Sequence, residues 1–412
     1  MKKIVLIVLI CVCIIFTGCK KSNEARNDII DSFESNEIIP VGDFSDGLAK
    51  VRKGDKIGYI NKEGKEIIPC IYDEGSTFSE GMASVKSDNK YGYIDINGKE
   101  VLPFIYEEAY GFVDGLAIVK SNDKYGFINV KGEEIVNCIY DEVNVFEDDL
   151  AKVSKDNKYG VVTKDGEEVI SCSYQDASIV SKEIIALKKG DKYGFVNNLG
   201  KEITSYEYDM SYYWLESEGL IRVKKNGKNG FINKNGKEVI PCIYDFAGSF
   251  SEGLTAVQKG NKFLYVDKMG KEILTTVYDE AYSFSDDLAV VKSGSKYGYI
   301  NKNGNIVLPC IYDFACAFKD GLAIVYKDEK KGVINKEGKE IIPCIYDELG
   351  SISNGLIRVK QNNKCGVIDN KGKEIIPLKY DEIYCISDGL IRAQKDGKFI
   401  YIDPAYNKII SF

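Results

Sequence analysis

The sequence predicts an all-β protein that is a tandem array of about eleven similar units. Three observations lead there: a fixed period of 34 residues broken by one step of 36, short apolar runs separated by glycine turns, and no apolar pattern of helical period. A constant period of this size is typical of repeat proteins. Most units are marked by one central glycine, and Leu264 and Ile400 stand in its phase in two others. The glycines are Gly58, Gly92, Gly126, Gly160, Gly194, Gly230, Gly298, Gly332 and Gly366.

The unit at residues 114–143 shows the expected elements in order. Its apolar runs are 116–119, 125–129 and 134–140, with polar or glycine-containing turns between them. Asn-Gly and Asp-Gly pairs at the turns of other units supply the positive φ that tight hairpins need. A glycine inside a strand pattern, such as Gly126, predicts the close approach of another backbone. Each unit is therefore expected to be a three-stranded antiparallel meander.

The packing of the units is less constrained by the sequence. A three-stranded unit cannot bury both of its faces alone, so neighbours must stack. Propellers usually have 4–8 blades of four strands, and these units are too many and too short for one such ring. The favoured architecture is an elongated, superhelical, β-solenoid-like array. A large or double β-propeller is the alternative.

The amino terminus has the features of an exported lipoprotein. Residues 1–18 combine two lysines, an apolar run and small residues before Cys19, which is typical of a secretory signal. A small residue before a cysteine at that point resembles a bacterial lipobox, which implies cleavage before Cys19 and diacylglycerol on its sulfur. A signal anchor or a simple signal peptide is the alternative. Residues 19–37 are expected to be a lipidated, flexible tether, and residues 38–412 the repeat domain.

Composition excludes several kinds of function. Without Lys2 and Lys3 the chain has 53 basic and 63 acidic residues, a net charge near −10, and no basic stripe. Nucleic-acid binding is therefore not expected. The chain has no histidine, so a Ser-His-Asp or Cys-His catalytic arrangement is impossible. Paired carboxylates recur in every unit, as hairpin tips would, so an enzyme is not expected.

Nine cysteines follow Cys19, and six of them occupy one repeat phase. A disulfide ladder, a metal site or a slot for a small apolar side chain would each explain the pattern. The slot is favoured because Phe104, Tyr206, Thr276 and Leu378 fill the same position in other units. No metal or other cofactor is expected, since the Cys-x-x-Cys spacing is absent as well. The six are Cys70, Cys138, Cys172, Cys242, Cys310 and Cys344.

The recurring frame of the units reads Gly-Leu-Ala-x-Val, then Gly-Tyr-Ile-Asn-x-x-Gly-Lys-Glu-Ile-Ile-Pro, then Tyr-Asp. Over residues 38–410 this frame resembles the WG (or KWG) repeats of bacterial surface proteins and lipoproteins. The resemblance implies an all-β repeat fold and export, and it implies no specific activity. In that family a tryptophan usually precedes the central glycine. Here the position holds other residues, such as Tyr91, Asn229 and Cys365, and never tryptophan.

One region departs from the repeat. The two-residue insertion lies between Tyr208 and Gly219, beside the sole tryptophan and several tyrosines. Aromatic side chains on a β surface suit stacking on sugar rings or on the apolar anchors of a partner. An enlarged loop that merely fills a gap is the alternative. The candidate binding residues are Tyr206, Tyr208, Tyr212, Tyr213 and Trp214.

A second aromatic pattern recurs in every unit. A tyrosine, usually followed by aspartate, closes each unit, as at Tyr140 and Asp141. The pair is expected to cap a turn, with a buried ring and a hydrogen-bonded hydroxyl. A ladder of tyrosines that binds a ligand is the alternative.

The sequence therefore favours a non-catalytic binding module, anchored by lipid on Cys19 at the cell envelope, on the surface or the periplasmic face of a membrane. Its expected partner is a glycan or a protein. The alternative is a structural spacer or surface-coat protein that acts by self-association.

Overall fold

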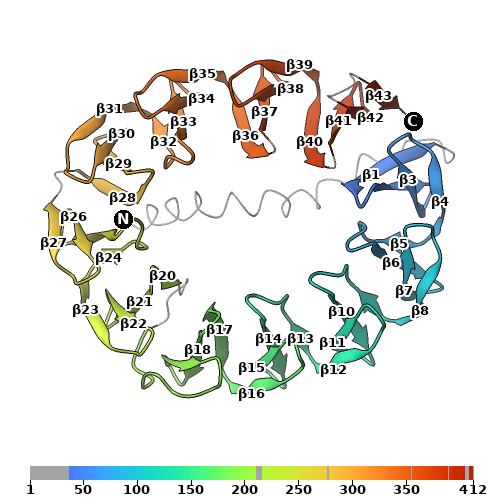
Figure 1. Cartoon of the computed structure of the whole chain (residues 1–412), viewed down its shortest axis with the longest axis horizontal. Helices are drawn as coiled ribbons and strands as arrows, with labels where there is room; N and C mark the ends of the chain where they lie inside the picture. Colours follow the sequence, from blue (N-terminus) through green and yellow to red (C-terminus); the bar gives the residue numbers. More distant parts are fainter. Residues whose placement is uncertain are drawn as a thin grey trace.

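The computed structural model shows eleven antiparallel sheets arranged as the blades of a ring (Figure 1). It describes residues 37–209, 216–275, 278–353, 355–387, 389–403 and 408–411. Blades are numbered 1 to 11 in chain order. In each blade the strands follow one another in sequence, so every blade is formed by one continuous stretch of chain. The first strands line the inside of the ring, and the fourth strands lie on its outside (Figure 1).

The strands are most easily followed by their position in the blade. The first strands are β1 (Ile38–Ser45), β5 (Glu74–Gly75), β9 (Glu108–Ala109), β13 (Glu142–Val143), β17 (Asp176–Ser181), β20 (Glu216–Ser217), β24 (Phe246–Ala247), β28 (Glu280–Ser285), β32 (Phe314–Ala315), β36 (Glu348–Ser353) and β40 (Glu382–Ser387). The second strands are β2 (Leu48–Lys53), β6 (Met82–Ser87), β10 (Leu116–Ser121), β14 (Leu150–Lys155), β18 (Ile184–Lys189), β21 (Leu220–Lys225), β25 (Leu254–Lys259), β29 (Leu288–Ser293), β33 (Leu322–Lys327), β37 (Leu356–Gln361) and β41 (Leu390–Lys395).

In the outer half of the ring, all eleven blades have a third strand and ten have a fourth strand in the described residues. The third strands are β3 (Lys56–Asn61), β7 (Lys90–Asp95), β11 (Lys124–Asn129), β15 (Lys158–Thr163), β19 (Lys192–Asn197), β22 (Lys228–Asn233), β26 (Lys262–Asp267), β30 (Lys296–Asn301), β34 (Lys330–Asn335), β38 (Lys364–Asp369) and β42 (Lys398–Asp403). The fourth strands are β4 (Glu66–Tyr72), β8 (Glu100–Tyr106), β12 (Glu134–Tyr140), β16 (Glu168–Tyr174), β23 (Glu238–Tyr244), β27 (Glu272–Thr275), β31 (Ile306–Tyr312), β35 (Glu340–Tyr346), β39 (Glu374–Tyr380) and β43 (Lys408–Ser411).

Blade 3 shows why this sequence folds into such a unit. Strands β10 and β11 pair from Leu116↔Asn129 to Ser121↔Lys124. The two residues of their turn both have positive φ, 53° and 60°, as a two-residue hairpin requires. At the next turn the Asn129 side-chain oxygen accepts hydrogen bonds from the backbone N–H groups of Lys131 (2.9 Å) and Glu133 (3.0 Å). Short-range turn chemistry therefore sets the register of the blade.

The prediction for the central glycine is confirmed. A Cβ atom on Gly126 would lie 2.4 Å from the carbonyl oxygen of Val136 and 2.8 Å from the nitrogen of Cys138, both on the neighbouring strand. No side chain can occupy that position without moving backbone.

The core consists of separate clusters between neighbouring blades. Tyr93 and Leu102 of blade 2, for example, pack with Phe112, Ala117 and Val119 of blade 3. Eleven such clusters are found in the described residues. An open row of eleven blades has one junction fewer than it has blades, so eleven clusters require a closed ring.

The closing junction joins blade 11 to blade 1 and repeats the contacts of the others. The Tyr59 hydroxyl donates a hydrogen bond to the carbonyl of Ser76 in the next blade (2.7 Å). Tyr401, in the same repeat phase, donates to the carbonyl of Gly42. Its ring also packs against Phe44, with ring centres 4.7 Å apart. The junction is therefore a normal blade interface.

The prediction of an elongated array of three-stranded units is therefore wrong. The structure is a closed ring of eleven blades, ten of them four-stranded, and so it matches the alternative of a large propeller. The missed strand is the first one, which in six blades has only two residues, as in β9 (Glu108–Ala109), and is too short to show an alternating pattern. Adding this strand lets each blade extend from the inside to the outside of the ring. Within the described ranges, no helix is both long and apolar enough to span a membrane.

Candidate functional site

Blade 5 is the three-stranded blade of the described sheets, because its fourth strand is reduced to two isolated bridges. In blade 1 the third and fourth strands pair at Ile57↔Tyr72, Tyr59↔Ile68 and Ile60↔Glu66. Blade 5 keeps only the counterparts of the first and last pair, as isolated bridges of Tyr193 with Tyr208 and Val196 with Glu202. The lost pair is that of Phe195 with Thr204.

Thr204 explains the interruption. Its side-chain oxygen accepts the backbone N–H of Phe195 at 3.0 Å, and the backbone N–H groups of Ile203 and Thr204 both donate to the carbonyl of Phe195. A hydroxyl that competes for backbone hydrogen bonds in this way disrupts a regular ladder. In nine other blades the same position is aliphatic: Ile68, Leu102, Val136, Ile170, Ile240, Leu274, Leu308, Ile342 and Ile376.

Of the five predicted binding residues, the structure describes two. Tyr208 is buried, 3% exposed, with its ring edge-on to Phe195 at a centre distance of 5.6 Å. Burial raises the pKa of its hydroxyl to about 12. Tyr206 is half-buried and stacks on Tyr174 at 6.5 Å between ring centres. Lys189 Nζ lies 5.6 Å from the centre of the Tyr206 ring. The other three, Tyr212, Tyr213 and Trp214, lie outside the described residues, and Cys19 does too.

A cavity of about 450 Å³ opens at the junction of blades 5 and 6. Its walls come from the start of β18, the end of β19, the interrupted strand and the β22–β23 turn of blade 6. The buried Ile184 lies among the lining residues, and Lys234 Nζ reaches Glu183 Oε2 across the junction at 3.5 Å. The lining residues are Glu183, Ile184, Asn197, Asn198, Lys201, Glu202, Ile203, Lys234 and Asn235.

Recurrent tyrosine–aspartate pairs link neighbouring blades. Tyr140 is only 4% exposed. The carboxylate of Asp141 binds the Lys124 ammonium through one oxygen and the backbone N–H of Asp156, in blade 4, through the other. The hydrogen bond from Lys124 is the main reason that the pKa of Asp141 lies below its ordinary value. The pair therefore links the end of one blade to a turn of the next.

The residue before the central glycine belongs to a cluster of polar side chains that the sequence analysis missed. The Tyr91 hydroxyl donates to Glu74 Oε2 at 2.6 Å, and Lys86 Nζ lies 2.7 Å from Glu74 Oε1 and 5.3 Å from the centre of the Tyr91 ring. Tyr125 with Glu108 and Tyr193 with Asp176 repeat the tyrosine–carboxylate bond. The signal was the acidic residue two places after the closing tyrosine, which is the first residue of the unpredicted strand.

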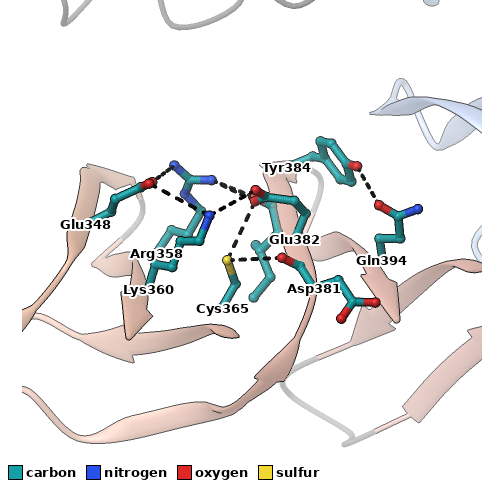
Figure 2. Close-up of polar contacts among 9 residues, drawn as sticks. Glu348, Arg358, Lys360, Cys365, Asp381, Glu382, Tyr384 and Gln394 are labelled. Atoms are coloured by element: carbon teal, nitrogen blue, oxygen red, sulfur yellow. Dashed lines mark hydrogen bonds and ion pairs between the residues drawn. The ribbon is translucent and has the colours of Figure 1, made fainter. Parts of the chain in front are cut away.

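In blade 10 a cysteine takes that position, beside a network of charges that spans blades 10 and 11 (Figure 2). Arg358 lies 3.4 Å from Glu348 and 3.3 Å from Glu382, and Lys360 pairs with both carboxylates. Cys365 Sγ lies 3.6 Å from a Glu382 oxygen. Burial, and then the Glu382 charge, raise the pKa of the Cys365 thiol. The thiol is therefore protonated at neutral pH and the charges are mutually compensated, which indicates a structural clamp.

The six in-phase cysteines occupy the expected slot in the fourth strands. Their thiols are free, and Cys138, for example, packs against the core between blades 2 and 3. Burial raises the pKa of Cys138 to about 11. In the part of the chain that the structure describes, no group of three acidic or cysteine side chains could hold a metal ion.

Comparisons with known proteins agree with the repeat. A family model described as WG containing repeat matches eleven consecutive segments: residues 30–56, 57–91, 91–125, 125–159, 159–193, 193–228, 230–263, 265–297, 297–330, 332–365 and 366–399. No curated protein matches the chain.

Solved structures with some similarity include a eukaryotic initiation factor, which has 10% identity and a TM-score of 0.38 over 71% of this chain and 93% of that one. Hsv2p of Kluyveromyces lactis has 11% identity and a TM-score of 0.29 over 54% and 89%. PorZ, a surface component of the type-IX secretion system of Porphyromonas gingivalis, has 11% identity and a TM-score of 0.25 over 92% and 59%. With TM-scores this low, the similarities carry no argument about function.

Proposed function

We propose that this chain, which belongs to the WG containing repeat family, is a non-catalytic binding module held at the cell envelope by a lipid on Cys19. Its partner is an envelope glycan or protein, and the binding site is the junction of blades 5 and 6. The interrupted strand and the 450 Å³ cavity fall at this junction, and in the sequence the two-residue insertion lies in the segment that connects the same two blades.

The interruption of the repeat carries the proposal. Nine other blades keep an aliphatic residue at the position of Thr204, and ten blades have a fourth strand in the described residues. Function in repeat proteins is expected where one unit departs from the others, because the shared positions are those that build the fold.

Self-association as a spacer or coat is less well supported. The ends of the repeat array meet in the blade 11–blade 1 junction, so neither end is left to extend the array. In β4 the carbonyl oxygen of Ile68 and the nitrogen of Cys70 face Gly58 of β3. Pro69 lies between them, so its nitrogen faces the outer edge of the sheet. Because proline has no N–H group, that edge lacks one hydrogen-bond donor. Proline at such edges hinders pairing with another sheet. Six fourth strands carry it: Pro69, Pro103, Pro241, Pro309, Pro343 and Pro377.

Two experiments test the proposal. For the anchor, the full chain and a Cys19→Ser variant are expressed in a bacterial host and their cells fractionated; the parent should remain with the membranes and the variant should be released. For binding, the immobilised full chain is exposed to envelope extract beside a Thr204→Ile variant. A component held saturably by the parent and lost with the variant supports the binding role. Recovery of this chain alone would support self-association instead.

A further inference from the structure

We infer that the cavity between blades 5 and 6 binds a neutral oligosaccharide segment, an inference that rests on the proposed binding function and names its ligand class. The volume of about 450 Å³ falls in the usual range for small-ligand sites, roughly 300–1,000 Å³. It is large enough for more than a single ion or water molecule.

The charges of the cavity favour a neutral ligand. Two carboxylates, Glu183 and Glu202, are balanced by two ammonium groups, Lys201 and Lys234. One pair of them, Lys234 and Glu183, is already in contact at 3.5 Å. An ionic ligand would have to compete with these internal partners and would find no net field of opposite sign to attract it.

The remaining groups suit a polyhydroxylated ligand with an apolar face. The side-chain amides of Asn198 and Asn235 form no hydrogen bond with other described residues, and each offers both donors and an acceptor. The half-buried Ile203 supplies an aliphatic surface beside them, with the buried Ile184 also among the lining residues. Sugar rings present the same combination, with hydroxyl groups at the edge and C–H groups on the face, and a few placed polar groups on an apolar wall are the usual means of orienting a ligand.

The turn that contributes Asn235 to the cavity packs on the end of the interrupted strand. A Cβ atom on Gly236 would lie 2.6 Å from the carbonyl oxygen of Ile203 and 2.8 Å from the Cγ2 atoms of Ile203 and Thr204. At most other junctions the side chain nearest to the equivalent glycine is the aliphatic residue in the Thr204 position, as Leu308 is for Gly338, whereas at Gly166 the nearest atom is again a backbone oxygen, that of Ile135. The feature that distinguishes the junction of blades 5 and 6 is therefore the interrupted strand, whose residues Glu202 and Ile203 line the cavity.

The test uses the full chain on an array of neutral hexose and N-acetylhexosamine oligosaccharides, printed beside sulfated and uronic-acid glycans. Affinities for the best neutral glycan are then measured by calorimetry for three variants. Asn235→Ala should weaken binding about tenfold, the usual effect of losing one or two ligand hydrogen bonds. Thr204→Ile, which restores the repeat, should abolish it. Asn97→Ala changes the equivalent turn of blade 2 and is the matched control, with no expected effect.

The outcomes separate this inference from the proposed function. Binding of neutral glycans that responds to Asn235→Ala but not to Asn97→Ala supports it. An array with no neutral ligand, salt-sensitive binding of acidic glycans only, or neutral binding unchanged by Asn235→Ala would overturn it. In those cases capture of an envelope protein that depends on the same junction would leave the proposed function standing. Thermal unfolding of each variant shows whether a loss of binding reflects a loss of fold.

Discussion

Blades 3 and 5 are built from the same unit and differ at one decisive position. Blade 3 has Val136 in its fourth strand, buried at 3% exposure, and a continuous β12. Blade 5 has Thr204 there, whose side chain takes the hydrogen bond that the strand needs. Both blades still close their outer end with the same buried tyrosine, Tyr140 or Tyr208. The ring therefore tolerates the loss of a strand as long as the packing between blades is kept.

The largest expected effect comes from the central glycines. Gly126→Ala in blade 3 places a Cβ 2.4 Å from a backbone oxygen, whereas in blade 5 the nearest atoms to a Cβ on Gly194 are 3.1 Å away. Gly126→Ala should cost about 3 kcal/mol or more and Gly194→Ala about 1 kcal/mol, because the backbone must move further in the regular blade to admit a Cβ atom. Urea unfolding of the two variants measures the difference. Equal losses would show that blade 5 is as tightly paired as the others.

Transplanting the threonine should break a regular blade. Val136→Thr keeps the shape of the side chain and adds a hydroxyl within reach of the Phe127 N–H, so it should cost about 1–3 kcal/mol. Hydrogen exchange of the amides of residues 134–140 should become faster. Unchanged exchange there would mean that the hydroxyl is not what interrupts blade 5.

The reverse change should repair blade 5. Thr204→Val removes the competing hydroxyl at constant shape and should raise the free energy of unfolding by about 1 kcal/mol. Exchange of the amides between Glu202 and Tyr208 should slow. A destabilised variant would show that the Thr204–Phe195 hydrogen bond is a net support of the present structure.

The smallest expected effect concerns acid stability and should be shared by both blades. Hydrogen bonds from Lys124 and Lys192 hold the pKa values of Asp141 and Asp209 below their usual range. Since the folded-state pKa is lowered, each carboxylate contributes stability above its unfolded value, about 3.9, and loses it as pH falls through the folded pKa. Asp141→Asn and Asp209→Asn should each flatten the decline of the thermal midpoint below about pH 4. A decline that neither substitution alters would assign acid unfolding to other groups.

Much of the fold could be predicted from the sequence, and the rest depended on features with no periodic signal. The strands such as 125–129, the hairpin turns and the close approach at Gly126 followed from residue spacing, and the family followed from the resemblance of the repeat frame to known repeats. The first strand could not be recognised because two residues, such as Glu108 and Ala109, carry no alternation. Ring closure could not be recognised either, since it depends on a small angle between blades that accumulates over eleven units.

The break in the repeat could be recognised from the sequence, but the geometry of the junction could not. The insertion directed attention to the segment between blades 5 and 6, where Tyr208 is part of the core and Tyr206 stacks on Tyr174. The interruption of the strand beside the cavity could not be predicted, because it involves one threonine, Thr204, whose hydroxyl competes with the backbone for a hydrogen bond. Export and lipidation at Cys19 remain predictions from the sequence.

The closed ring itself is tested most directly by distances between spin labels in solution. Labels attached to non-natural amino acids at Lys53, Ser87 and Lys395 occupy the same phase in blades 1, 2 and 11. If Tyr401 and Gly42 join the ends as the structure shows, the distance from 53 to 395 equals that from 53 to 87. A 53-to-395 distance several times longer than the 53-to-87 distance would mean an open array and would contradict the account.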